Sequence, residues 1–326
     1  MLRFIDLFAG IGGIRIAFER SGCQCVFTSE IDKNCQLMYE TNFGNKPFGD
    51  ITKISAKEIP DHDILTGGFP CQSFSIIGNG LGFEDIRGTL FFEIERILRE
   101  KRPKAFLLEN VKQLTTHDSG RTFKIIIEHL KNLNYFVHYK VLNALNFGLP
   151  QKRERIIIVG FTENFPFTFP KSDNKKIRLI DILEPNELID KKHFLSDYSR
   201  EKFRNKLIEQ GKSDTITPAI WHENKGGNIG IHDYSCALRA NGSYNYLTVN
   251  GIRRLSPREM FRLQGFPDTY KIVVSDVQAR KQAGNSVAIT LIEAVAKSML
   301  EAMQKEPNYE IEHPNLFNFN LQASSW

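Results

Sequence analysis

Cysteine is scarce in this sequence, and the few copies are scattered. The 326 residues include five cysteines, which show neither the close pairing of a zinc site nor the patterned spacing of a disulfide framework. Such cysteine usage is typical of a protein from a reducing, intracellular setting. We therefore predict that the chain has no metal site and no disulfide framework.

A long hydrophobic run is also absent. The longest stretch without a charged residue, 64–83, contains five glycines and Pro70, which exclude a membrane span. The N-terminus is apolar but is interrupted by Arg3, Asp6 and Arg15, and it lacks the basic lead and cleavable apolar block of a signal peptide. We therefore expect a cytoplasmic chain with no membrane partner.

Neither sign of charge dominates the composition. The 43 Lys and Arg and the 38 Asp and Glu give a net charge of +5, which permits an anionic partner without requiring one. Apolar residues make up 41% of the chain and charged residues 25%, which are ordinary proportions for a globular protein. The composition therefore excludes a disordered chain, a collagen and a coiled coil.

The first half of the chain alternates short apolar strands with helices. Strands connected by helices in this way form a parallel sheet that is covered on both faces. We therefore predict an α/β fold, with the last two strands paired antiparallel at the sheet edge. The predicted strands are 3–8, 24–30, 63–66, 105–109, 135–142 and 155–161, and the predicted helices are 14–20, 33–43, 90–101 and 121–133.

The composition changes after residue 164. Residues 165–250 are rich in glycine, asparagine, serine and aromatic residues, and their charges nearly balance. Helical periodicity returns at 257–263 and again at 287–303, where a helix is expected to pack back on the first domain. We therefore predict an α/β domain at 1–164, a smaller irregular domain inserted at 165–250, and a C-terminal segment at 251–326 that returns to the first domain.

The sequence DLFAGIGG connects the first predicted strand to the first helix. Glycine lacks a Cβ, so the backbone of such a turn can approach a ligand closely. Glu30 ends the second strand, twenty residues after Gly10, where a carboxylate can accept both ribose hydroxyls of a nucleoside cofactor. Because Gly13 directly follows Gly12, the spacing departs from that of dinucleotide-binding turns. These two features alone fit a tight turn beside a surface glutamate equally well.

Three further groups follow strand ends, where ligands bind in such sheets. Cys71 lies in GGFPCQSFS directly after Pro70; most cysteines are small buried apolar side chains, but this glycine-rich loop is poor core material and could close over a substrate. Glu109 ends the fourth strand in ENV, where Asn110 could cap a helix by itself. QKRER, at 151–155, places a cationic cluster at the mouth of another strand, although such a cluster can also be a solvated charge run.

Together these motifs resemble the DNA cytosine carbon-5 methyltransferase family. The matching residues are, in order, DLFAGIGG, Glu30, Gly49 with Asp50, GGFPCQSFS, GTLFFEI, ENV, QKRERI, LSPREMFRLQGFP and QAGNSV. The similarity covers 2–161 and 251 to about 303, and this order of motifs is highly specific. The resemblance implies a Rossmann-like S-adenosylmethionine-dependent methyltransferase sheet, with a target-recognition domain in the unmatched middle of the chain.

The resemblance also implies a set of catalytic residues. Carbon 5 of cytosine is a weak nucleophile, so the Cys71 thiolate is expected to add to carbon 6 and create an enamine. Glu109 is expected to contact ring nitrogen 3 and the exocyclic amine, and Arg155 to steady the oxygen on carbon 2. Arg153 belongs to the same cationic motif and is predicted to be part of the catalytic set.

The implied cofactor is S-adenosylmethionine. By similarity, Glu30 binds the ribose and Asp50 the adenine amine, while Ile31 stands where the family often has an aromatic residue beside the adenine. The other predicted cofactor residues are Phe8, Gly10 and Gly12 of the first turn, Ile51, Pro70 and Leu90, and Asn285, Ser286 and Val287 of the last motif.

The implied partner is double-stranded DNA, from which the target cytosine must be flipped out to reach such a pocket. Arg239 is flanked by small residues and can read a guanine in a groove, although a phosphate contact is almost equally expected. Ala237 stands where the family usually has threonine, so one phosphate hydrogen bond is expected to be missing. The predicted DNA contacts are Gln72, Ser75, Ile76 and Ile77 on the cysteine loop and Arg239 in the recognition region.

Three alternative functions share part of this pattern. A tRNA cytosine methyltransferase has the same motifs, but its characteristic Cys-Phe-Thr stretch is not found here. A NAD-dependent oxidoreductase would use the first turn and Glu30 but would leave Cys71 and Glu109 unexplained. A catalytically inactive DNA-binding protein is disfavoured because every catalytic position is filled. The first strand begins almost at residue 1, which resembles bacterial restriction-modification methylases, and such an enzyme can have a cognate restriction endonuclease as its partner.

Overall fold

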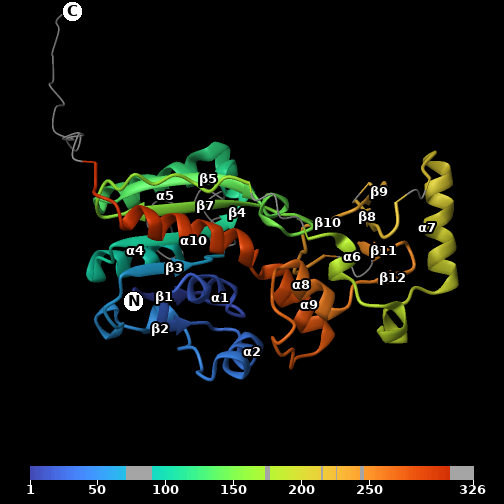
Figure 1. Cartoon of the computed structure of the whole chain (residues 1–326), viewed down its shortest axis with the longest axis horizontal. Coiled ribbons are helices and arrows are strands. Elements are labelled where there is room, and N and C mark those ends of the chain that lie inside the picture. The colour runs from blue at the N-terminus through green and yellow to red at the C-terminus, as the bar shows by residue number, and fades with distance from the viewer. Residues whose placement is uncertain (71–89, 173–176, 214–215, 225, 243–245, 309–326) are drawn as a thin grey trace, which may run out of the picture.

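The computed structural model of the chain has two lobes of unequal size (Figure 1). The structure describes residues 1–70, 90–172, 177–213, 216–224, 226–242 and 246–308. The larger lobe contains a six-stranded sheet and the smaller lobe a four-stranded sheet. The predicted α/β fold, with a smaller irregular unit before the C-terminal helix, is therefore confirmed.

The larger sheet has the strand order β2-β1-β3-β4-β7-β5. Its strands are β1 (Arg3–Leu7), β2 (Gln24–Ser29), β3 (Ile64–Gly67), β4 (Ala105–Val111), β5 (Phe136–Asn143) and β7 (Glu154–Phe161). β1 pairs in parallel with β2 on one side and with β3 on the other. The chain therefore leaves β1 in one direction and returns on its other side, which creates a switch point between β1 and β3.

The reversed strand of this sheet is β7, which is antiparallel to both β4 and β5. Antiparallel pairing was predicted for this region, but its placement at the sheet edge was wrong for β7, because this strand lies between β4 and β5. β5 forms the edge. The short connection from β5 to β7 allows antiparallel neighbours, whereas parallel neighbours need a longer crossover.

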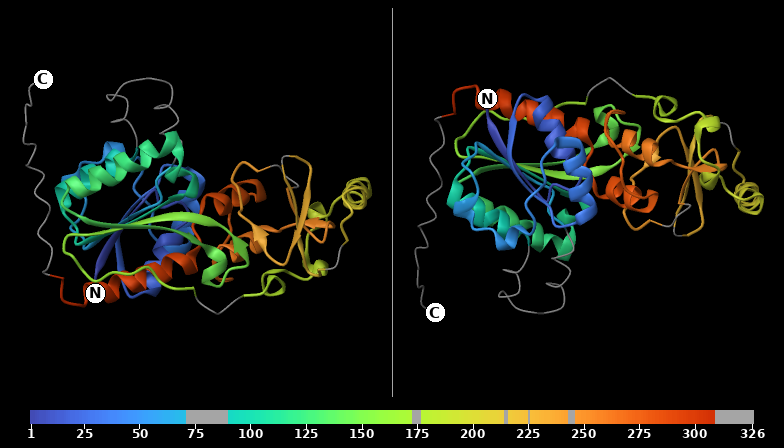
Figure 2. Two further views of the ribbon diagram at one scale, coloured as in Figure 1. Left: turned by 90° about the horizontal axis from the view of Figure 1, so that it is seen from above. Right: turned by 90° about the horizontal axis from the view of Figure 1, so that it is seen from below.

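Helices cover both faces of the larger sheet (Figure 2). Because side chains alternate along a strand, Phe4, Ile64 and Leu107 pack on one face while Ile5, Leu65 and Leu108 pack on the other. α1 (Gly13–Arg20), α2 (Lys33–Phe43) and α10 (Ile289–Met303) cover the first face, and α4 (Leu90–Lys101) and α5 (Arg121–Asn132) cover the second. Burial of apolar side chains on both faces is the main stabilisation of this lobe.

Local signals explain why two helices have the bounds that were predicted. Asp32 caps the N-terminus of α2, where its side chain accepts the backbone N–H groups of Asn34 and Cys35, and Gly44 caps the C-terminus in the left-handed conformation. α8 (Pro257–Leu263) begins with a capping box of Ser256 and Glu259, with proline at its first position.

The smaller lobe is built on short strands with one short and one longer helix. Its sheet has the order β12-β11-β8-β9, with β8 (Ile220–Glu223), β9 (Ile229–His232), β11 (Leu247–Val249) and β12 (Arg253–Arg254). β10 (Ser235–Cys236) pairs in parallel with β6 (Gln151–Lys152), and the helices are α6 (Leu179–Ile182) and α7 (Asp197–Glu209). The small sheet includes β12, which lies after residue 250, the predicted end of the inserted domain. The domain boundaries remain a prediction.

The C-terminal segment connects the two lobes. α8 and α9 (Asp276–Asn285) lie between them, and α10 returns to pack on α1 of the larger lobe (Figure 1). The sequence did not predict α7 or α9, because the buried residues of α7 are Phe203 and Leu207 and those of α9 are small or polar. None of the helices in the described part of the chain is long and apolar enough to cross a membrane.

Candidate active site

A cavity of about 450 Å³ lies at the carboxyl ends of β1, β2, β3 and β4. Open α/β sheets bind their ligands at this edge, and the volume suits a nucleotide-sized molecule. The predicted residues that line the cavity are Phe8, Gly10, Glu30, Ile31, Asp50, Ile51, Pro70, Leu90, Glu109, Arg153, Arg155, Asn285, Ser286 and Val287. Predicted cofactor and catalytic residues from distant parts of the chain thus surround one cavity.

The first turn shapes one wall of the cavity. Phe8 and Gly10 both have left-handed backbone conformations, with φ of 57° and 56°. This conformation is uncommon for a residue with a side chain, and such strain is often found at functional sites. A Cβ added to Gly10 would meet no atom within 4 Å, so this glycine leaves room for a ligand.

Gly12 has a different place from the other predicted cofactor residues, because it does not line the cavity. A Cβ on Gly12 would lie 2.3 Å from the ring of Phe43. Its φ of 80° also favours glycine. The geometry therefore indicates that Gly12 allows the turn to pack against α2.

Glu30 follows the end of β2 at the cavity wall. Its carboxylate oxygens accept the backbone N–H groups of Gly10 at 2.8 Å and Asp32 at 2.7 Å. These hydrogen bonds fix the carboxylate while each oxygen keeps a lone pair for a ligand hydroxyl. Burial raises the pKa of Glu30 above its ordinary value, and perturbed acids of this kind are common at functional sites.

Asp50 and Ile31 form a neighbouring part of the wall. Asp50 Oδ1 accepts hydrogen bonds from the backbone N–H and the hydroxyl of Thr52, at 3.1 and 2.8 Å. These bonds lower the pKa of Asp50 and keep it ionised. Ile31 is 68% exposed, which leaves an apolar surface open beside the two carboxylates for a flat ring to cover.

Glu109 and Arg155 form an ion pair on the wall made by β4 and β7. Glu109 Oε1 lies 2.9 Å from Arg155 Nε, and both side chains are largely buried. Among the described residues, no group forms a well-oriented hydrogen bond to this oxygen. A buried carboxylate oxygen with remaining capacity, beside a guanidinium, is suited to bind the polar edge of a ring.

Cys71 lies outside the described residues, as do the predicted DNA contacts Gln72, Ser75, Ile76 and Ile77. Pro70 directly precedes Cys71 and lines the cavity. The last described residue before Cys71 therefore lines the same cavity as Glu109 and Arg155.

Asn110 fixes the start of this loop. Its side-chain N–H donates to the backbone oxygen of Phe69 at 2.9 Å, from β4 to the end of β3. The expectation that Asn110 can serve as a helix cap was wrong, because the short helical turn at Lys112–Thr115 has Val111 at its N-cap and no side-chain cap. The Asn110 side-chain oxygen accepts the backbone N–H of Val111 at 2.8 Å instead of an N–H of the helical turn.

Arg153 is fully buried and makes its hydrogen bonds to main-chain carbonyls. Its guanidinium donates to the oxygens of Leu238 and Gly284, each at 3.1 Å, and to that of Ser286. Burial, together with the charge of Arg155, lowers the pKa of Arg153 to about 9. Arg153 thus ties the smaller lobe to the end of α9 at the cavity wall, and this geometry favours a positioning role over direct contact with a substrate.

Several residues of the cavity were not predicted. Lys281 on α9 forms an ion pair with Asp32 at 3.2 Å and so connects α9 to the start of α2. Gln282 also lines the cavity, and its place in QAGNSV was the available signal. Cys35 lines it too, but burial raises the pKa of this thiol to about 12, so it is a poor nucleophile.

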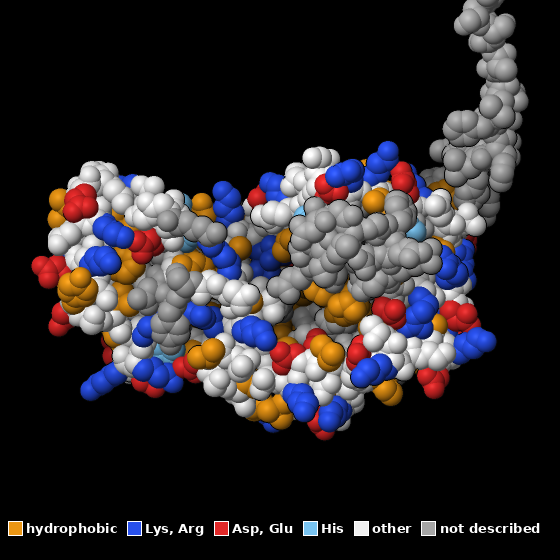
Figure 3. Space-filling model, turned by 180° about the vertical axis from the view of Figure 1, so that it is seen from behind, with side chains coloured by type: hydrophobic (Ala, Val, Ile, Leu, Met, Phe, Trp, Pro, Cys, Tyr) orange, Lys and Arg blue, Asp and Glu red, His pale blue; other side chains and the backbone are white. Residues whose placement is uncertain are grey.

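The surface between the two lobes forms a recess in which Lys and Arg side chains gather (Figure 3). Arg239 is exposed in the segment between β10 and β11, next to Leu238, which Arg153 holds. The described part of the chain contains no group of three or more His, Cys, Asp or Glu that could hold a metal ion.

Comparison with known proteins identifies the class to which this fold and site belong. The family model for C-5 cytosine-specific DNA methylase matches residues 2–301. The chain therefore belongs to the C-5 cytosine-specific DNA methylase family, as its motifs predicted.

Relatives of known type define the enzyme more closely. The chain is 60% identical to type II methyltransferase M.NgoBI of Neisseria gonorrhoeae over 91% of this chain and 92% of that protein. It is 58% identical to M.HaeII of Haemophilus aegyptius over 92% and 93%, and 44% identical to M.HhaI of Haemophilus parahaemolyticus over 94% and 96%. The protein is a C-5 cytosine DNA methyltransferase of the restriction-modification type.

Solved structures show the same fold. An Entamoeba histolytica methyltransferase, EhMeth, has a TM-score of 0.73 at 19% identity and covers 94% of this chain and 99% of its own. A triple mutant of DNMT2 from Spodoptera frugiperda also has a TM-score of 0.73 at 19% identity, with coverage of 92% and 100%. At this identity the likeness concerns the fold alone.

Proposed function

We propose that the protein transfers a methyl group from S-adenosylmethionine to carbon 5 of a cytosine flipped out of a specific duplex DNA sequence, through a covalent Cys71 adduct at carbon 6. The observation that carries this proposal is the shared cavity: Glu30 and the Glu109–Arg155 ion pair line the same space, and Pro70 leads from it into Cys71. This arrangement supports a nucleoside-binding role for Glu30 and a ring-binding role for the Glu109–Arg155 pair.

The residues around the cavity suit S-adenosylmethionine. Glu30 accepts the ribose hydroxyls, Asp50 accepts the adenine amine, and Ile31 packs on the adenine ring. Phe8, Gly10, Asn285, Ser286 and Val287 surround the methionine end, while Ile51, Pro70 and Leu90 complete the walls. When bound, the cofactor supplies an electrophilic methyl group on a sulfonium.

The chemistry begins with Cys71. Its thiolate forms a bond to carbon 6, and the electron pair of the carbon 5–carbon 6 double bond moves so that carbon 5 becomes nucleophilic. Glu109 holds ring nitrogen 3 and the exocyclic amine, and supplies a proton or hydrogen bond as charge builds on the ring. Arg155 binds the oxygen on carbon 2. After methyl transfer, a base removes the proton from carbon 5, the double bond reforms, and the thiolate leaves.

Access to a cytosine in a duplex requires base flipping. The cysteine loop, with Gln72, Ser75, Ile76 and Ile77, contacts the vacated space, and the region 165–250 reads the surrounding sequence. Arg239 reads a base edge, with a phosphate contact as the competing role. The protein acts in the bacterial cytoplasm on nucleoid DNA, and a cognate restriction endonuclease that cuts the same site is its proposed partner.

A methyl donor labelled with tritium in the methyl group tests the reaction. Duplex DNA is expected to acquire label, whereas tRNA and a reaction without nucleic acid are not. Label in tRNA alone would favour the RNA methyltransferase alternative. The absence of label from both DNA and tRNA would contradict a methyltransferase function. The matched control is Cys71→Ser, which is expected to lose turnover by far more than tenfold while it still binds DNA and S-adenosylmethionine, because an alcohol is a much poorer nucleophile than a thiolate.

A further inference from the structure

The segment 238–242, which we call the recognition turn, has a backbone that is fixed from several sides. Gln151 Oε1 accepts the N–H of Leu238 at 3.0 Å, and the Arg153 guanidinium donates to the oxygen of the same residue at 3.1 Å. Gln151 and Arg153, both in QKRER, therefore hold the backbone N–H and the backbone oxygen of one residue of the smaller lobe. The exposed Arg239 directly follows Leu238. Its Cα therefore has a defined position relative to QKRER, the motif that also contains Arg155.

The far end of the turn is held from α9. Arg280 donates to the oxygen of Gly242 at 3.2 Å, and the turn closes with a hydrogen bond from the N–H of Gly242 to the oxygen of Arg239. The turn packs directly on Gly284, since a Cβ at this residue would lie 2.3 Å from the N atom of Ala240. The backbone of the recognition turn is therefore held firmly against α9.

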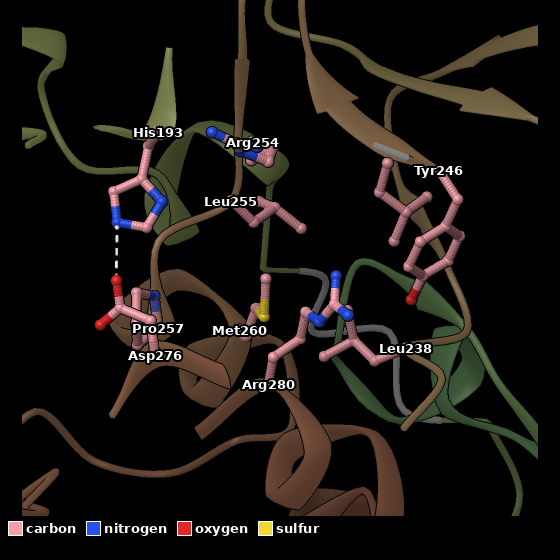
Figure 4. Close-up of a pocket in the computed structure, with 10 residues that line it drawn as sticks. His193, Leu238, Tyr246, Arg254, Leu255, Pro257, Met260, Asp276 and Arg280 are labelled. Atoms are coloured by element: carbon pink, nitrogen blue, oxygen red, sulfur yellow. Dashed lines mark ion pairs between the residues drawn. The ribbon is translucent and has the colours of Figure 1, made fainter. Parts of the chain in front are cut away.

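The Arg239 side chain is also held, although it is exposed. Its Nη2 lies 3.2 Å from Nε2 of His222 on β8, and its Cζ lies 5.1 Å from the centre of the Tyr246 ring. The Tyr246 hydroxyl accepts the backbone N–H of Arg239 at 2.8 Å, and the rings of His222 and Tyr246 meet edge to face. Figure 4 shows Tyr246, Leu238 and Arg280 around the pocket behind this turn.

We propose that His222 and Tyr246 are specificity-determining residues that hold the Arg239 guanidinium in the orientation needed to read a guanine edge in the major groove. This inference rests on the proposed role of Arg239 in reading DNA. A guanidinium reads guanine through two parallel hydrogen bonds to O6 and N7, and this contact demands a fixed orientation of the side chain. The Arg239 side chain is held by an imidazole and an aromatic ring on a fixed backbone, so its orientation is defined in the way that this contact requires.

The state of His222 matters for this arrangement. Its Nε2 can accept from Arg239 only in the neutral imidazole, because both nitrogens of the cation are donors. Burial lowers the pKa of His222, and so do the nearby charges of Arg239 and of His232 on β9. Near pH 7 the ring is neutral and holds Arg239; protonation removes the acceptor and adds a like charge beside the guanidinium.

The test is competition binding of the full chain against a library of single-base variants of its own site, with His222→Leu, His222→Gln and Tyr246→Leu. His222→Leu and Tyr246→Leu are expected to lose at least tenfold of the discrimination at one base pair, with an unchanged salt dependence. His222→Gln keeps an acceptor and is expected to retain most of the discrimination. His232→Gln on the neighbouring strand is the control, since its side chain does not hold Arg239.

A pH series gives a second readout that a merely structural role would not move. Discrimination by the wild type at that base pair is expected to fall only at a pH below the ordinary histidine value of ~6.5, because the pKa of His222 is lowered, while His222→Gln remains unaffected. S-adenosylmethionine affinity, measured beside each value, shows that each variant is folded.

Two results would overturn the inference. The first is full discrimination in both His222→Leu and His222→Gln. The second is a loss of affinity in His222→Leu and Tyr246→Leu that is equal for every DNA sequence and comes with a shallower salt dependence. If Arg239→Ala also keeps full discrimination, Arg239 does not read a base. The labelled-methyl assay on wild type separates that outcome from failure of the proposed function, because methyl transfer to DNA does not depend on which residue reads the site.

Discussion

Two buried carboxyl groups of the larger lobe, one at the cavity wall and one inside the sheet, lie in surroundings that disfavour ionisation. Burial raises the pKa of both Glu30 and Asp6. Glu30 keeps two backbone donors, whereas Asp6, fully buried on β1, has a hydroxyl donor from Thr66 at 3.1 Å. Each residue leads to a separate prediction.

Glu30→Ala is expected to weaken S-adenosylmethionine binding by roughly 1–3 kcal/mol, because a fixed acceptor for the ribose hydroxyls is lost from a partly buried wall. Isothermal titration calorimetry measures the change. Glu40→Ala removes an exposed carboxylate from α2 and is the matched control. An unchanged dissociation constant for Glu30→Ala would place the cofactor elsewhere.

Asp6→Asn is expected to remove part of the pH dependence of stability. Burial raises the pKa of Asp6 to about 7, so the folded chain binds a proton there that the unfolded chain releases near pH 4. The stabilisation by the protonated acid is present below pH 4 and is lost as the pH rises through 7, a loss on the order of 4 kcal/mol. Thermal unfolding of both proteins from pH 4 to 8 measures it.

The expected result is a melting temperature of the wild type that falls relative to Asp6→Asn across this pH range. A constant difference between the two proteins would show that Asp6 titrates as an ordinary exposed acid.

At the scale of elements, the position of the recognition turn depends on the end of α9. Gly284→Ala places a Cβ 2.3 Å from the N atom of Ala240, and a backbone neighbour can yield only by moving the turn. We expect a cost of about 1–3 kcal/mol, typical of overpacking, with reduced discrimination between DNA sites. The melting temperature and competition binding to DNA are measured, and Gly226→Ala in the smaller lobe is the control.

A Gly284→Ala protein that keeps both its melting temperature and its discrimination would show that α9 does not fix the turn. The loss of melting temperature alone would assign Gly284 to stability and leave recognition to other contacts.

The strands of the larger sheet and the motifs could be predicted from the sequence, whereas the short strands of the smaller lobe and the helices α6, α7 and α9 could not. β1, β3 and β4 are short apolar runs between helices, so their pattern is strong. α9 buries Ala279, Gln282 and Gly284, which have no large apolar side chain to create a helical period. The sequence therefore predicted the residues at the end of α9 as a motif without the helix that presents them.

The contacts that hold Arg153 could not have been predicted either. Glu109 and Arg155 have recognisable neighbours in ENV and QKRER, and the structure brings these two side chains together. Arg153 bonds to the carbonyl oxygens of Leu238, Gly284 and Ser286, and every residue has such an oxygen. No residue type in the partner segments signals the contact.

Across the whole molecule, Arg153 joins the smaller lobe to the end of α9 at the cavity wall. Arg153→Lys is expected to destabilise the protein by about 1–3 kcal/mol, because an ammonium cannot span three carbonyls and leaves buried acceptors without donors. Affinity for S-adenosylmethionine and for DNA should both fall. Calorimetry and binding assays test this, with the exposed neighbour Lys152→Ala as the control.

If Arg153→Lys loses turnover but keeps stability and both affinities, Arg153 acts on the reacting ring directly. That result would support its predicted place among the catalytic residues and contradict the positioning role that the geometry favours.

The proposed reaction is methylation by this protein of carbon 5 of cytosine within one duplex sequence, with Cys71 as the nucleophile. Bisulfite sequencing of plasmid DNA, from cells that lack other cytosine methylases and express either wild type or Cys71→Ser, tests it most directly. We expect protected cytosines at every copy of a single sequence with the wild type and none with Cys71→Ser. Absence of protected cytosines with the wild type, or equal protection with Cys71→Ser, would contradict it.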